Sequence, residues 1–111
     1  MQVAEHKEGA VTVLKPLGPL TAGELEELER RLTALGQNWA KRVVLDLHDA
    51  AFMDSAALEL LCRHHRDFAA RGLNLKLSDV GEMAGEILEL TRLAGRFEIY
   101  ADTAAAVRSF R

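Results

Sequence analysis

The sequence is poor in the residues and segments that mark several specialised classes of protein. Cys62 is the only cysteine among 111 residues, so no internal disulfide can form, which is typical of a reducing compartment. No apolar run approaches the roughly 20 residues that cross a bilayer, and residues 1–8 lack the apolar stretch of a secretion signal. We therefore expect a cytoplasmic protein that does not insert directly into a membrane.

Charge of one sign is not concentrated anywhere in the sequence. The 14 Lys and Arg residues stand against 17 Asp and Glu residues, for a formal net charge of −3. The densest basic cluster, residues 63–66, is interrupted by His64 and His65. Because binding to nucleic acid depends on a dense basic surface, we expect no nucleic acid partner.

Motifs for catalysis, metal binding and cofactor binding are missing as well. There is no G-x-S-x-G turn to present a nucleophilic serine, and no glycine-rich loop to cradle a phosphate group. His64 and His65 are adjacent, so they point to different sides of a helix and cannot chelate one metal ion together. We expect a protein with no metal, no cofactor and no enzymatic activity, in which Cys62 is a small core residue.

The sequence does contain a regular alternation of strand-like and helix-like segments. Apolar runs bounded by turn residues predict strands over residues 3–7, 10–17, 42–47, 73–77 and 97–100. Because short loops join the strands to helices between them, we expect right-handed parallel crossovers. The predicted fold is one α/β domain over residues 1–111. Its mostly parallel central sheet has four to five strands with an antiparallel edge strand, and four helices cover it.

Capping residues predict where the helices begin. Thr21 and Glu24 have the spacing of a capping box, so the first helix should begin at Thr21. The other helices are predicted to begin at Ser55, at Ser78 or Asp79, and at Asp102 or Thr103. The apolar residues expected on one face of the third helix are Met83, Ile87, Leu90 and Leu93.

The junction before the second helix carries the most informative residues. Asp54 is expected to cap this helix, and the Ser55 hydroxyl to be exposed near unbonded backbone N–H groups. An added phosphate there would change what the surface can bind. The inward stripe of the helix is predicted to hold Leu58, Leu61, His65 and Phe68. Leu60 and Ala56 fall on the opposite side, so we expect Leu60 to be exposed to solvent.

These features together resemble a STAS domain, the family of bacterial anti-sigma-factor antagonists and their relatives. The resemblance extends over nearly the whole chain and lies in Gly18-x-Leu20, in Asp54-Ser55 after its strand, and in Leu90-Thr91-x-Leu93 before Phe97. It implies binding to an anti-sigma factor that is also a serine kinase. It further implies Ser55 as the phosphorylation site, a phosphatase that reverses the modification, and a role in transcription regulation. The candidate partner contacts are Asp54, Ala56, Leu60 and Thr21, in a monomer or weak dimer.

Departures from the family pattern leave alternatives open. Ala56 and Ala57 stand where the family usually has serine and glycine, and Thr21 stands where a carboxylate is common. These departures favour a STAS subunit that is not switched, as part of a larger regulatory scaffold or a lipid-transport complex. A further alternative is an esterase-type enzyme with Ser55 as its nucleophile.

Overall fold

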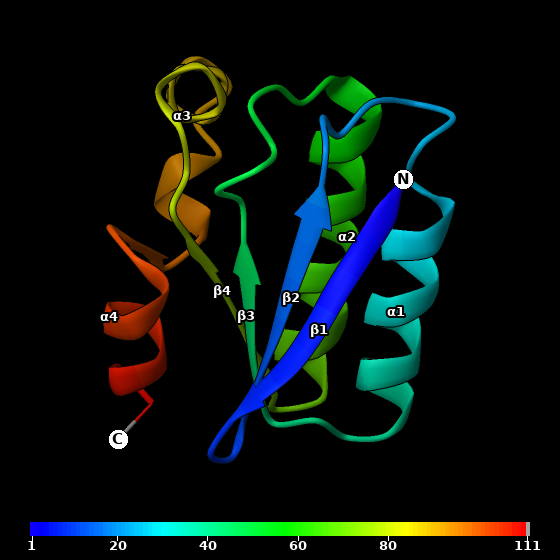
Figure 1. Ribbon diagram of the computed structural model, residues 1–111, viewed down its shortest axis with the longest axis vertical. Helices are drawn as coiled ribbons and strands as arrows, with labels where there is room; N and C mark the ends of the chain where they lie inside the picture. The colour runs from blue at the N-terminus through cyan, green and yellow to red at the C-terminus, as the bar shows by residue number, and fades with distance from the viewer. Residues whose placement is uncertain (111) are drawn as a thin grey trace.

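A five-stranded sheet forms the centre of the molecule (Figure 1) in the computed structural model, which describes residues 1–110 apart from the side chain of Ala94. The strands are β1 (Gln2–Glu8), β2 (Val11–Leu17), β3 (Arg42–Asp46), β4 (Asn74–Ser78) and β5 (Ile99–Tyr100). They lie in chain order across the sheet. The β1–β2 pair is antiparallel and all other pairs are parallel. The predicted mixed α/β fold with an antiparallel edge strand is confirmed.

Helices lie on both faces of this sheet and at one end of it. They are α1 (Glu26–Gln37), α2 (Ser55–Ala70), α3 (Glu82–Leu90) and α4 (Thr103–Arg108), with a short 3₁₀ turn at Ala94–Arg96. In Figure 1, α1 and α2 lie side by side to the right of the sheet and behind it, α4 lies to its left beside β3 and β4, and α3 lies beyond the carboxyl ends of the strands. Within residues 1–110, no helix is long and apolar enough to cross a membrane.

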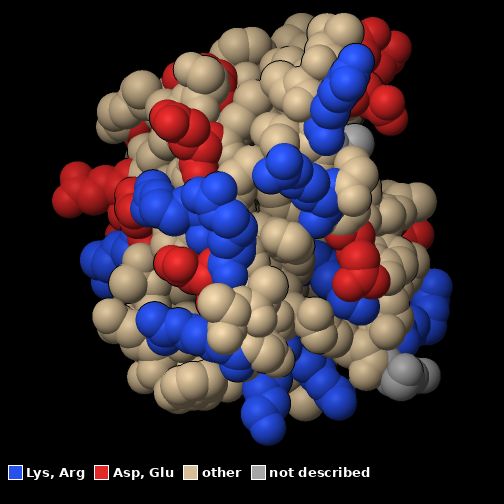
Figure 2. Space-filling view, turned by 180° about the vertical axis from the view of Figure 1, so that it is seen from behind, with Lys and Arg blue, Asp and Glu red and all other residues tan. Residues whose placement is uncertain are grey.

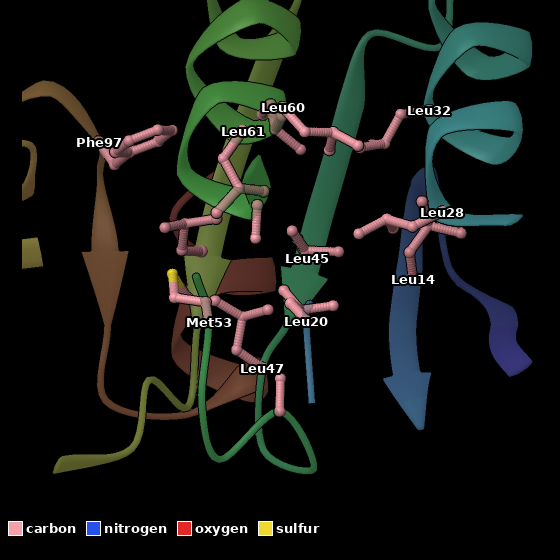
Figure 3. Close-up of a cluster of buried hydrophobic side chains, with 14 of the residues drawn as sticks. Leu14, Leu20, Leu28, Leu32, Leu45, Leu47, Met53, Leu60, Leu61 and Phe97 are labelled. Carbon is pink, nitrogen blue, oxygen red and sulfur yellow. The ribbon is translucent and has the colours of Figure 1, made fainter. Parts of the chain in front are cut away.

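The main hydrophobic core fills the space between the sheet and the pair α1 and α2 (Figure 3). In β3, Val43 and Leu45 face this core, whereas Val44 packs in a smaller cluster with Ala106 of α4. Since successive side chains of a strand point to opposite faces, a strand covered on both sides needs an unbroken apolar run. The run Val43-Val44-Leu45 meets that need.

The first helix begins later than its capping-box pattern predicts. Residues Thr21 to Glu24 form a turn instead, in which the N–H of Glu24 donates to the Thr21 carbonyl at 2.9 Å and Gly23 has φ +91°. Helix α1 starts at Glu26 with no side-chain cap. The prediction was wrong because Leu20 forms a parallel bridge with Met53. This contact with a distant part of the chain holds residues 21–24 as a loop.

The third helix also differs from its prediction. Ser78 ends β4, Asp79 adopts a left-handed conformation with φ +53°, and α3 begins only at Glu82. Its buried residues are Ala84 and Leu88, whereas Leu90 is 84% exposed and Met83 is 55% exposed. Of the four apolar residues predicted for one face, Ile87 and Leu93 are half-buried and pack against the main core, so the prediction is wrong only for Met83 and Leu90. Helix α3 lies beyond the carboxyl ends of the strands, so only part of this face meets the core.

In α2 the structure corrects two predictions. Leu60 is only 2% exposed and lies in the main core with Leu28 and Leu32 of α1 (Figure 3), so its expected place on a solvent face was wrong. His64, not His65, is the buried histidine, while His65 is half-buried and packs edge-on against Phe97. The reason is that α2 is covered on two sides, by the sheet and by α1, and a single inward stripe accounts for only one of them.

Candidate functional site

Ser55 is the first residue of α2, at the point where the loop after β3 turns into the helix. Its side chain is exposed, at the same end of the sheet as the carboxyl ends of β2, β3 and β4. The next residues anchor the helix: Ala57 is buried in the main core, and Ala56 is half-buried. The hydroxyl group therefore stands at the open end of a firmly seated helix.

The Asp54 carboxylate holds this helix start in place with both of its oxygens. Its Oδ1 accepts a hydrogen bond from the N–H of Ala57 at 3.0 Å, which confirms Asp54 as the N-cap. Its Oδ2 accepts from the N–H of Ala22 at 2.7 Å. The hydrogen bond from Ala22, followed by the one from Ala57, lowers the pKa of Asp54, so this carboxylate is ionised at neutral pH.

The loop before α1 and the loop before α2 are joined into one surface. The N–H of Leu20 donates to the Phe52 carbonyl at 2.9 Å, and the N–H of Asp54 donates to the Leu20 carbonyl at 3.0 Å. Leu20 and Met53 are themselves fully buried. This bridge brings Thr21, which is half-buried, to the same surface as Asp54, Ser55 and Ala56, although it precedes them by more than 30 positions.

One residue that was predicted for this surface does not reach it, and one residue that does reach it was not predicted. Leu60 lies in the core, so it is not available to a partner. Phe52 is 41% exposed in the loop that leads to Ser55, and it was not among the predicted partner contacts. An aromatic residue placed between a buried strand and a helix cap was the available signal, because exposed aromatic side chains are common anchors of protein interfaces.

Among residues 1–110 there is no group of three or more His, Cys, Asp or Glu side chains that could hold a metal ion. His48 lies in the loop after β3, with each ring nitrogen about 4.0 Å from a carboxylate oxygen of Asp49 or Asp79. The site is thus a surface built from two loops and a helix start, with one exposed hydroxyl and one fixed carboxylate.

Comparison with known proteins places this architecture in a family. The sequence model of the STAS domain matches residues 2–106. A STAS-domain anti-sigma-factor antagonist protein from Planctomyces limnophilus superposes with a TM-score of 0.85 at 24% identity, covering 98% of this chain and 97% of that one. An anti-sigma factor antagonist from Mycobacterium paratuberculosis gives 0.88 at 18% identity, covering 97% and 92%.

A third similar structure is the phosphorylated form of the Bacillus cell-fate determinant SpoIIAA. It superposes with a TM-score of 0.77 at 16% identity, covering 99% of this chain and 100% of that one. These likenesses, all below 25% identity, agree with the observed fold. On the match of the family model over residues 2–106, the chain belongs to the STAS domain family.

Proposed function

We propose that this protein is an anti-sigma-factor antagonist whose partner is an anti-sigma factor with serine kinase activity. Phosphorylation of Ser55 by that partner ends the complex, and a phosphatase restores the binding form. The observation that carries the proposal is the exposed Ser55 hydroxyl at the first turn of α2, beside a carboxylate held by two loops. Since sigma factors act with RNA polymerase inside the cell, the proposal places the protein in the cytoplasm.

The fold can tolerate a phosphate at this position. The first N–H groups of an α-helix carry partial positive charge, and an anion there is stabilised by about 0.3–1 kcal/mol. Ser55 is exposed, so a phosphate would displace no packed side chain. Modification should therefore leave the folded state intact.

The same phosphate would strongly change the surface that a partner contacts. It adds about −1.5 to −2 charges at neutral pH next to Asp54, which is already ionised. A partner that packs against the neutral serine would face both repulsion and the cost of desolvating a dianion. A cost of a few kcal/mol corresponds to roughly 100-fold in affinity.

The proposed contact surface consists of Asp54, Ala56, Thr21 and Phe52 around Ser55. Phe52 supplies exposed apolar area, and Ala56 is small enough to let a partner approach the helix start closely. Two of the similar structures are anti-sigma factor antagonists by name, which supports the proposed binding of an anti-sigma factor. A third is SpoIIAA in a phosphorylated form, which supports the proposed control by phosphorylation.

The proposal is tested by incubating the protein with the serine-kinase anti-sigma factor of its host and ATP, followed by peptide mass spectrometry. We expect one phosphate on Ser55 and none in Ser55→Ala. Thr33→Ala, which removes an exposed hydroxyl on α1, serves as the matched control and should be phosphorylated like the wild type. Absence of phosphate on Ser55 in the wild type would reject the switch.

Binding is measured separately from phosphorylation, so the two parts of the proposal can fail independently. Ser55→Glu should bind the kinase roughly 100-fold more weakly than Ser55→Ala. If the kinase binds the protein but transfers no phosphate, the unswitched STAS subunit of a larger assembly becomes the better description. The presence of Ala56 and Ala57 after Ser55 is the observation that favours that alternative.

A further inference from the structure

A groove of about 470 Å³ runs along α2, between this helix and the segment that follows α3. It is lined by Leu58, Glu59, Cys62, Arg63, Arg66 and Leu93. Figure 2 looks onto the helix side of the molecule, where Lys and Arg side chains gather across the middle of the face. The groove starts one helical turn beyond Ser55, because Glu59 lies four residues after it in α2.

The two ends of this groove carry opposite charges. Glu59 stands at the end near Ser55, and Arg66 lies seven residues farther along α2, or roughly 10 Å along the helix axis. Arg63 is already bonded to Glu29 of α1. Arg66 is exposed and forms no hydrogen bond or ion pair within residues 1–110, so its guanidinium group is available to an incoming carboxylate.

Apolar side chains of α2 and of the segment after α3 line the groove beside these charges. Leu58 is buried there, and Cys62 and Leu93 are half-buried and pack against the main core. An apolar centre with arginine at its rim is the usual composition of a protein-binding surface. The combination fits an apolar side chain of a partner better than it fits a fully charged ligand.

We propose that a segment of the partner protein docks in this groove while the partner covers Ser55. This proposal rests on the proposed function, because a partner seated on Ser55 is what brings a segment to the mouth of the groove. The segment carries a cationic residue toward Glu59, an apolar residue over Leu58 and Leu93, and a carboxylate toward Arg66. Glu59 and Arg66 are separated by a distance that about two turns of a helical segment, or about three residues of an extended one, would span.

The first test measures the affinity of the host's serine-kinase anti-sigma factor for three forms of this protein. They are Ser55→Ala alone, Ser55→Ala with Arg66→Glu, and Ser55→Ala with Arg42→Glu, so that phosphorylation does not interfere in any of them. We expect Arg66→Glu to weaken binding roughly tenfold or more. Arg42→Glu is the control, because Arg42 is an exposed arginine of β3 that does not line the groove, and its reversal changes the net charge equally. It should change affinity by less than about twofold.

The second test uses Cys62, the only cysteine, as a probe of the groove in the unmutated chain. Alkylation by iodoacetamide is followed at the Cys62 peptide with and without saturating kinase. We expect the bound kinase to slow the reaction at least roughly tenfold. The rate for this protein alone should not change with its own concentration; a fall would assign the groove to a second copy of the chain and overturn the proposal.

The outcomes separate this inference from the proposed function. If the kinase binds the wild type well and Arg66→Glu binds equally well, or if bound kinase leaves the Cys62 rate unchanged, the groove is not the docking site although the function stands. If the kinase does not bind at all, both proposals fail together. Weakened binding by Arg66→Glu together with protection of Cys62 supports the groove.

Discussion

Helix α2 lines the groove and α3 leads into the segment that carries Leu93 on its other side, but the rest of the molecule covers these two helices to different extents. Six residues of the 16-residue α2 are buried, and its start is fixed by the Asp54 side chain. The nine-residue α3 has two buried residues, no side-chain cap, and exposed Met83 and Leu90. A segment with few buried contacts opens more readily than one seated in the core. Helix α2, which lines the groove and carries Ser55, is therefore the more firmly held of the two, and α3 should open more readily.

The largest expected effect contrasts two leucines, one in each helix. Leu60→Ala removes a side chain that is 2% exposed in α2, and should lower the free energy of unfolding by about 2–5 kcal/mol. Leu90→Ala makes the same change at a position that is 84% exposed in α3, and should change it by less than about 0.5 kcal/mol. Urea denaturation measures both. Equal losses would show that α3 is as well packed as α2.

The second prediction concerns the side-chain cap that α2 possesses and α3 lacks. Asp54→Ala removes the acceptor for the N–H groups of Ala57 and Ala22, so we expect the midpoint of thermal unfolding to fall by roughly 5 °C. Thr21→Ala is the control at the neighbouring loop. It leaves the Thr21 carbonyl, which closes the turn, in place, and should shift the midpoint by less than about 2 °C. Calorimetry measures the midpoint of thermal unfolding of both variants. An unchanged midpoint in Asp54→Ala would contradict the role of the carboxylate as a cap.

The third prediction adds to α3 the cap that it lacks. Gly81 is its N-cap residue, with extended backbone and open space where a side chain would project. Gly81→Asp should raise the free energy of unfolding by about 0.5–1 kcal/mol, through a new cap and a less flexible unfolded chain. Gly81→Ala supplies only the second of these contributions, so the difference between the two variants isolates the cap. A loss of stability in Gly81→Asp would refute the assignment of this N-cap.

The smallest effect is a pH dependence that arises from a buried histidine in α2. His64 is 4% exposed, and its Nε2 forms no hydrogen bond within residues 1–110 and lies 3.9 Å from a Glu29 oxygen. Burial, followed by the nearby Arg63, lowers the pKa of His64. The unfolded chain therefore binds the proton more readily, and stability should fall as the pH drops through about 6.5 toward the lower folded value.

His64→Leu should remove this part of the pH dependence. His6→Gln, at an exposed histidine of β1, should retain it and is the control. The measurement is urea denaturation at several pH values between about 5 and 7.5. An identical slope in the wild type and in His64→Leu would contradict the assignment.

The features that sequence could predict are those that depend on neighbours along the chain. Asp54 was expected to cap its helix, and either Asp102 or Thr103 to open the last one; Asp54 and Asp102 are the caps, each accepting from the N–H three residues ahead. The apolar run at residues 42–47 likewise predicted the strand β3, and its two faces are both covered. In each case the determining contacts are local or follow directly from the strand geometry.

The features that sequence could not predict depend on contacts between distant segments. Thr21 has a sound capping pattern, but the bridge between Leu20 and Met53 turns the segment into a loop. Leu60 is buried because α1 packs beside α2, which no periodicity within α2 reveals. The same holds for the site: the position of Ser55 at a helix start was predictable, whereas the Ala22–Asp54 bond and the exposure of Phe52 were not.

The Asp54 carboxylate spans two stretches of chain whose bonded residues are 32 positions apart. A linear peptide that contains Ser55 lacks the upstream stretch, so its aspartate is free to rotate and the serine loses its fixed neighbour. Under the proposed function, such a peptide should be a poor substitute for the folded protein in an assay with the kinase. Transplanting the proposed switch into another scaffold would likewise require both loops to be moved together.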